Sequence, residues 1–214
     1  MSVELLRSSL SILLQGLVTT VLLSVAAIVG GTLLGLIAAV LRSFGPFGTS
    51  RAAQVYTELF RGTPVLITLM FIYFGVSYFG YAIDVFAAGA IGLSVYQGAY
   101  IAEIFRSGIE AVPKGQWEVS QILGLDRTRT FAFVVLPQTG RIVLPPLVGQ
   151  YLSLIKDTSI VSMIGMSELM HGGQAIVDRV GRPVEIYGLV ALIYFVVCFP
   201  ISQWVRHHDR RRLS

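Results

Sequence analysis

The feature that most constrains this chain is a long run without one charged side chain, from Ser8 to Leu41. The hydrocarbon core of a bilayer is about 30 Å thick, so a helix needs about 20 apolar residues to cross it. Four further stretches approach that length: Gly62–Ile83, Val85–Ala102, Ile142–Ile155 and Ile186–Val205. Their apolar residues come in blocks rather than in alternation, which favours helices over barrel strands. The sequence therefore predicts an all-α polytopic membrane protein with five transmembrane helices.

The composition agrees with a membrane location. Charged residues make up 13% of the chain and hydrophobic residues 54%, whereas soluble domains carry about 25% charge. The 214 residues suit one domain, so residues 1–214 are expected to form a single transmembrane unit. The formal net charge of +4 does not indicate a nucleic-acid partner, because the basic residues are spread over loops and no nucleic-acid-binding motif is present.

The run Ile142–Ile155 is the weakest predicted span. It contains Pro145 and Pro146, and Pro137 precedes it. A proline inside a helix removes a backbone hydrogen bond and bends the helix. We therefore expect this helix either to begin before Arg141 and kink, or to be partly sheltered by neighbouring helices.

Lysine and arginine residues predict the orientation of the spans. Five spans place the loops alternately on two sides, and the side richer in Lys and Arg is normally cytoplasmic. One side receives Arg42, Arg51, Arg61, Arg106, Lys114, Arg127, Arg129, Arg141, Arg206, Arg210, Arg211 and Arg212, and the other receives Arg7, Lys156, Arg179 and Arg182. The N-terminus is then expected outside and the C-terminus in the cytoplasm.

The largest predicted cytoplasmic loop, about residues 106–141, contains the short amphipathic segment "KGQWEVSQILGL". A helix is expected from Gln116 to Leu123, with Glu118 in its first turn and Gly124 just past its end. Val119, Ile122 and Leu123 share one face of that helix. Such a short helix is marginal alone in water, so something must cover this face. The residues by themselves favour the membrane surface or the chain's own body over a groove on a partner protein.

The same loop resembles the EAA loop of ABC importer permeases. The pattern is a Glu, two small residues, a Gly six positions after the Glu and a distal Leu-Pro, here Glu118, Val119-Ser120, Gly124 and Leu136-Pro137. Segments throughout the chain resemble the polar amino-acid branch of these permeases, the histidine, glutamate, glutamine and arginine type: Phe60–Gly75, Ala99–Glu118, Leu136–Leu147 and Leu152–Ile164. The departure is Val119-Ser120, where the family usually has Ala-Ala.

The resemblance implies a type I ABC importer transmembrane fold in the bacterial cytoplasmic membrane. It also implies that the loop carries a coupling helix, which docks into an ATPase subunit through Glu118, Val119, Ile122, Leu123 and Gly124. The implied partners are an ABC ATPase dimer, an extracytoplasmic amino-acid-binding protein, a second permease subunit and membrane lipid. The chain lacks the motif G-x-x-x-x-G-K-[ST], so ATP and Mg²⁺ are expected on the ATPase. We expect no catalytic residue, cofactor or metal on this chain.

Polar side chains inside membrane spans are default candidates for contact with a transported solute. Gln97 and Gln150 lie within predicted spans, and Lys156 and Asp157 lie at the outer end of one. Each has a structural alternative: the two glutamines can hydrogen-bond across helices, and Lys156 and Asp157 can form an ion pair or end a helix. Glu103 is expected to pair with Arg106 at i,i+3.

Two further expectations concern packing and the outer side. Gly31 and Gly35 are spaced for close contact between helices. The outer loop, about residues 159–185, carries Glu168, Asp178, Arg179, Arg182 and Glu185, which suit either contact with a binding protein or a solvated loop.

The alternative to an ABC permease is a self-sufficient secondary transporter or channel. Secondary transporters build their coupling-ion sites near the middle of the membrane. No acidic residue is expected within a span interior, which argues against ion coupling.

Overall fold

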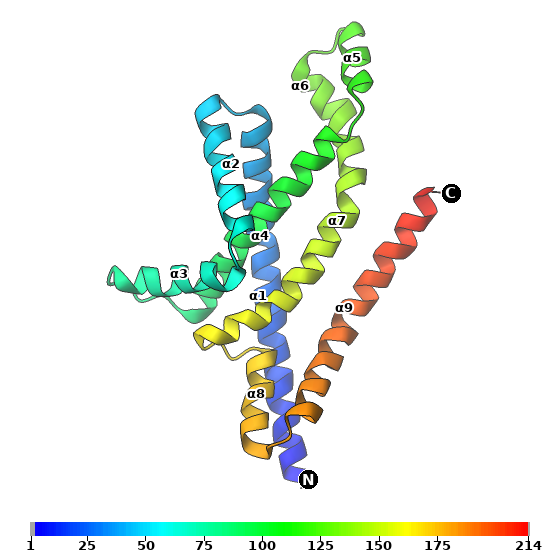
Figure 1. The fold of residues 1–214 in the computed structure, drawn as a ribbon. Helices are drawn as coiled ribbons and strands as arrows, with labels where there is room; N and C mark the ends of the chain where they lie inside the picture. The colour runs from blue at the N-terminus through cyan, green and yellow to red at the C-terminus, as the bar shows by residue number, and fades with distance from the viewer. Residues whose placement is uncertain (1–2, 214) are drawn as a thin grey trace.

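The computed structural model describes residues 3–213, with side chains for residues 9–204, and its regular structure is entirely helical. The helices are α1 (Val3–Phe44), α2 (Phe47–Gly62), α3 (Val65–Tyr78), α4 (Val85–Glu110), α5 (Lys114–Ile122), α6 (Arg127–Thr130), the π-helix η1 (Phe131–Val135), α7 (Leu136–Asp157), the 3₁₀-helix η2 (Thr158–Ile164), α8 (Leu169–Val180) and α9 (Pro183–Leu213). Figure 1 shows an elongated bundle in which α1 runs most of its length, with α5 and α6 at the end far from the N-terminus. The predicted all-α class is confirmed.

Four of the described helical stretches are long and apolar enough to cross a membrane: Ser9–Phe44, Val85–Glu110, Arg127–Ile164 and Pro183–Trp204. A fifth crossing exists only if α2 and α3 count together as one span bent by 109°. Four of the five predicted spans are thus confirmed, and the fifth takes a different form.

The predicted span Gly62–Ile83 is not one continuous helix in the structure. The chain breaks at Thr63, which is extended, and α3 then starts after Pro64 with only 14 residues. A residue that precedes proline is pushed out of the helical region by the proline ring. The break therefore follows from the Thr-Pro sequence, and it turns α3 sharply away from α2 (Figure 1).

The prediction that the fourth span begins before Arg141 is confirmed. The apolar helical stretch starts at Arg127, passes through the π-helix η1 and continues along α7 with Pro145 and Pro146 inside it. Because α4 also continues to Glu110, the segment between the two long helices is shorter than the predicted loop and holds α5 as its main element.

The close packing predicted at Gly31 and Gly35 is confirmed, and the neighbour is α4 of the same chain. A Cβ on Gly31 would come within 2.9 Å of Gln97, and one on Gly35 within 2.9 Å of the carbonyl oxygen of Gly98. Only glycine therefore lets the backbones of α1 and α4 approach this closely.

The predicted outer loop is largely helical, since η2 and α8 occupy most of it. Asp178 and Arg179 are exposed on α8. Arg182 and Glu185 lie 3.9 Å apart at the exposed start of α9.

Glu168 departs from the expectation of an exposed loop residue, because its side chain is fully buried. It is the N-cap of α8 and accepts hydrogen bonds from the backbone N–H groups of Met170 (2.9 Å) and His171 (2.8 Å). The hydroxyls of Tyr194 on α9 (3.1 Å) and Thr20 on α1 (3.4 Å) also donate to it. One carboxylate thus joins three helices, and burial raises its pKa while these donors oppose the rise.

Candidate functional site

The first candidate site is α5, the helix predicted to couple the chain to an ATPase. It begins at Lys114, directly after Pro113, and ends at Ile122. The predicted helix is confirmed, but it starts two residues earlier than Gln116. Glu118 consequently lies outside the first turn, contrary to the prediction, and its side chain is exposed.

A glycine ends α5 in the predicted way. Gly124 has φ +84°, a left-handed conformation that favours glycine. Its N–H donates to the carbonyl of Gln121 (3.0 Å), and the N–H of Leu125 donates to that of Ser120 (3.0 Å). These two bonds form a Schellman motif, which satisfies carbonyls at the helix end.

The inner face of α5 explains why a small residue is needed there. Ser120 is its one buried residue, and the hydroxyl donates to the carbonyl of Gln116 (2.6 Å). This face packs against η1. The serine in the Val119-Ser120 pair therefore occupies the closely packed side, whereas Val119 lies on the outer side.

The apolar stripe of α5, formed by Val119, Ile122 and Leu123, is uncovered. The three residues are 55%, 84% and 75% exposed. Within the described part of the chain, nothing packs over the stripe. The alternative in which the chain's own body covers this face is therefore wrong for the described residues. An exposed contiguous apolar patch usually marks an interaction surface.

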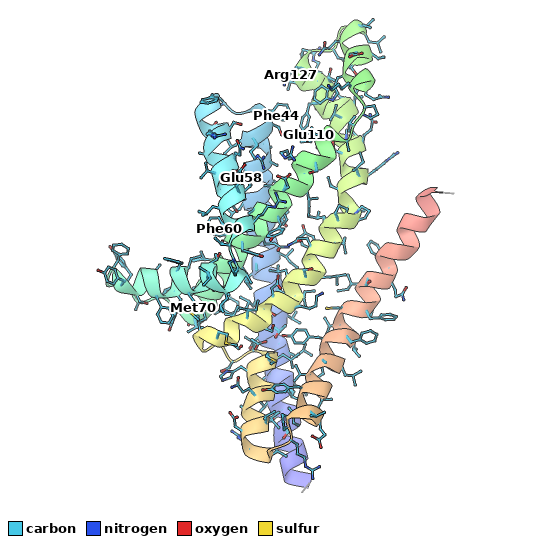
Figure 2. The ribbon with its side chains drawn as sticks, in the orientation of Figure 1. Phe44, Glu58, Phe60, Met70, Glu110 and Arg127 are labelled. Atoms are coloured by element: carbon cyan, nitrogen blue, oxygen red, sulfur yellow. The ribbon has the colours of Figure 1, made fainter. Side chains whose placement is uncertain are left out.

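The segment that carries α5 is nevertheless held to the bundle. The rings of Phe44, at the end of α1, and Phe131, in η1, pack edge to face with centroids 4.5 Å apart. A cavity of about 430 Å³ next to this contact is lined by Phe44, Glu110, Trp117 and Arg127, among others. Figure 2 shows the labelled Phe44, Glu110 and Arg127 close together near the end of the molecule that carries α5.

The second candidate site lies between α4 and α7, where the structure brings Gln97 and Gln150 together. The Gln150 side-chain amide donates to the Gln97 side-chain oxygen (3.0 Å), and the Gln97 amide donates to the Gln150 main-chain oxygen (3.1 Å). Gln97 is fully buried. It is therefore a link between helices and has no surface for a solute, whereas Gln150 is only half-buried.

Lys156 and Asp157 form the C-terminal end of α7, as the helix-end alternative predicts. Lys156 is exposed and lines a mainly apolar groove with Tyr194 and Cys198 of α9. Asp157 is half-buried and lies near Tyr96 of α4. These two residues thus lie well apart from α5, at the C-terminal end of α7.

Glu103 is the centre of a charge cluster that sequence reasoning found only in part. The predicted ion pair between Glu103 and Arg106 is confirmed, and Arg106 also pairs with Glu110. Arg42 of α1 contacts Glu103 at 2.8 Å, and Arg61 of α2 contacts Glu103 at 3.2 Å. These two contacts join residues far apart in the sequence, and no spacing rule signals them.

Two acidic side chains are more enclosed than the sequence predicted. Glu103 is 18% exposed within the span Val85–Glu110, and Glu168 is fully buried beside α1. Glu103 directly follows the predicted span Val85–Ala102, and α4 continues through it to Glu110. Arginines occupy both oxygens of Glu103, and four donors occupy those of Glu168, so neither carboxylate is an open ion ligand.

Comparisons with known proteins agree with this architecture. The family model described as "Binding-protein-dependent transport system inner membrane component" matches residues 31–214. The glutamine transport system permease protein of Escherichia coli (strain K12) is 37% identical over 205 residues, which cover 95% of this chain and 94% of that protein. The arginine ABC transporter permease protein of Haemophilus influenzae is 38% identical over 201 residues, which cover 91% and 90% of the two.

Solved structures have the same fold. A chain of an amino acid ABC transporter crystallised with histidines superposes with a TM-score of 0.91 at 34% identity, covering 99% of this chain and 100% of that chain. An inward-facing MetNI methionine ABC transporter has a TM-score of 0.73 at 19% identity and covers 99% of both chains, a likeness of fold alone. The chain therefore belongs to the family of binding-protein-dependent transport system inner membrane components, the permease subunits of ABC importers.

Proposed function

We propose that this chain forms one half of the membrane pathway of an ATP-driven importer for a polar amino acid. The uncovered stripe of Val119, Ile122 and Leu123 carries the proposal, because an apolar surface at the far end of the bundle suits docking into a partner. The relatives support the solute class, since they are named for glutamine, arginine and L-cystine.

In the proposed mechanism, ATP hydrolysis takes place in a separate dimer of ATPase subunits. Closure of that dimer moves the docked α5, and the long helices then switch between openings toward the two sides. A binding protein delivers the amino acid from outside. A second permease subunit, identical or related, supplies the other half of the pathway.

Reconstitution tests this function. The chain, co-expressed with its ATPase, is placed in vesicles, and uptake of labelled glutamine, arginine and cystine is measured. We expect uptake of at least one of them only when ATP, the ATPase and the binding protein are all present. Uptake by the permease alone, driven by an ion gradient, would show the secondary transporter instead. Copurification of tagged and untagged copies distinguishes a homodimer from a heterodimer.

The proposed orientation has the N-terminus outside and the C-terminus in the cytoplasm. The excess of Lys and Arg on the side expected to be cytoplasmic supports it. Arg7, Arg206, Arg210, Arg211 and Arg212 lie outside the residues whose side chains are described.

Cysteine labelling tests the orientation. Starting from a Cys198→Ser background, which removes the single cysteine, Gly115→Cys and Arg179→Cys place exposed thiols at opposite ends of the bundle. A membrane-impermeant maleimide applied to intact cells is expected to label only the cysteine at 179. Labelling of the cysteine at 115, with none at 179, would reverse the orientation.

A further inference from the structure

The cavity next to the contact between Phe44 and Phe131 is lined mainly by polar side chains. Its volume of about 430 Å³ is within the range of ordinary small-ligand pockets, about 300–1,000 Å³. Five helices contribute to the lining, with Arg42 from α1, Ser50 from α2, Arg106 and Glu110 from α4, Trp117 from α5 and Arg127 from α6. Figure 2 labels Glu110 and Arg127 at the end of the molecule that carries α5. The cavity therefore lies between the segment that carries α5 and the rest of the bundle.

The cavity wall carries more positive than negative charge. Its lining includes three arginines, Arg42, Arg106 and Arg127, and one carboxylate, Glu110. Glu103 does not line the cavity, but it pairs with Arg42 and Arg106, and Arg106 also pairs with Glu110. Even with Glu103 included, the three arginines outnumber the carboxylates, so the cavity favours an anion.

Arg127 has the guanidinium that is available to such an anion. Its side chain is exposed, and within the described part of the chain it forms no ion pair. The neighbouring carboxylate of Asp126 has another partner, because it accepts from the backbone N–H of Arg129 (2.8 Å) and contacts the Arg129 side chain at 3.5 Å. A guanidinium with open N–H edges can bind two oxygens of a phosphate through parallel hydrogen bonds.

The three arginines lie near the ends of apolar stretches that are long enough to cross a membrane. Each stretch has one of them in its first or last two turns: Arg42 in Ser9–Phe44, Arg106 in Val85–Glu110 and Arg127 in Arg127–Ile164. Charged residues that flank a span lie at the level of the lipid head groups, where basic pockets between helices bind anionic lipids. Trp117, which is half-buried in the same cavity, fits this level, because tryptophan is enriched at the membrane surface. The cavity is therefore at the depth of the lipid phosphate groups.

We propose that this cavity binds the head group of an anionic phospholipid. Arg127 donates to the phosphate oxygens, and Arg42 and Arg106 supply further positive charge. This site goes beyond the proposed function and does not depend on it. Because the lining combines Trp117 of α5 with Arg42 of α1, a bound head group stabilises the position of α5 against the bundle.

Lipid titration tests the site. Dioctanoyl-phosphatidylglycerol and the zwitterionic dioctanoyl-phosphatidylcholine are each titrated into the permease–ATPase complex in a non-ionic detergent, and bound lipid is counted by native mass spectrometry. Wild type is expected to bind phosphatidylglycerol about tenfold or more tightly than phosphatidylcholine, because choline brings a positive charge toward the arginines. Arg127→Gln should weaken the binding of phosphatidylglycerol by about tenfold. Glycerol phosphate, the soluble competitor, is expected to leave phosphatidylglycerol bound at equal concentration.

Arg129→Gln is the matched control. It removes the same charge from the same short helix, α6, but Arg129 is exposed outside the cavity lining, so the binding of phosphatidylglycerol is expected to stay near wild type. Equal losses in the two variants, unchanged binding by Arg127→Gln, equal affinity of wild type for the two lipids, or no bound phosphatidylglycerol would overturn the proposal. Displacement by an equal concentration of glycerol phosphate would overturn it as well, and would assign the cavity to a soluble phosphate compound.

Discussion

Replacing Ile122 with aspartate is expected to abolish ATP-driven uptake while leaving the chain folded in the membrane. Ile122 is 84% exposed, so the variant removes no internal packing. In a docked complex, burial of an isoleucine contributes about 1.5–3 kcal/mol, and an unpaired carboxylate in the closed interface adds a further penalty. The affinity for the ATPase should therefore fall by about 100-fold or more, as measured by copurification and by initial uptake rate.

The matched control for this variant is Gln121→Asp. It introduces the same charge one residue away, on the face of α5 opposite the apolar stripe. The cost of an acidic residue near the helix C-terminus is then shared by both variants. Gln121→Asp is expected to keep most of the uptake. If Ile122→Asp also kept normal uptake, or if both variants lost uptake equally, the stripe would not be the docking surface.

Glu168→Ala is expected to lower the stability of the purified protein more than any surface change. It removes the N-cap of α8 and leaves the buried hydroxyl of Thr20 and the hydroxyl of the half-buried Tyr194 without the carboxylate that accepts from them. Each buried group left unpaired costs about 1–3 kcal/mol, and loss of the cap costs about 1 kcal/mol. We expect the melting temperature in detergent to fall by about 10 °C.

Two variants show whether burial causes this effect. Asp84→Ala also removes an N-cap carboxylate that accepts two backbone N–H bonds, from Phe86 and Ala87, but its site is exposed. Its melting temperature should fall by only a few degrees. Because burial raises the pKa of the Glu168 carboxyl, the neutral Glu168→Gln should stay closer to wild type than the alanine variant. Equal shifts for the alanine variants at 84 and 168 would contradict a central role for the buried cluster.

The parts of the fold that sequence reasoning predicted correctly depend on local patterns. A charge-free run is sufficient to predict α1, and the same holds for the apolar part of α9. The stripe and the terminal glycine predicted α5, apart from its first residues. The break between α2 and α3 also has a local signal, Pro64, but the apolar run across it masked that signal.

The remaining features depend on contacts between residues far apart in the chain. Glu168 looks like a loop residue until α1 and α9 close over it. Gln97 and Gln150 are separated by 53 positions, so their mutual bonding becomes visible only when α4 packs on α7. Arg61 lies 5.7 Å from the centroid of the Tyr100 ring because α2 packs against α4, and no local pattern in the sequence signals that contact.

The glycine contacts between α1 and α4 limit how the molecule can change shape. Sliding α4 along α1 by one residue, about 1.5 Å, would bring larger side chains against Gly31 and Gly35, where there is no free space. The two helices therefore have a single working register. We expect them to travel as one rigid body throughout a transport cycle, so the openings toward the two sides of the membrane must come from other helices moving against this pair.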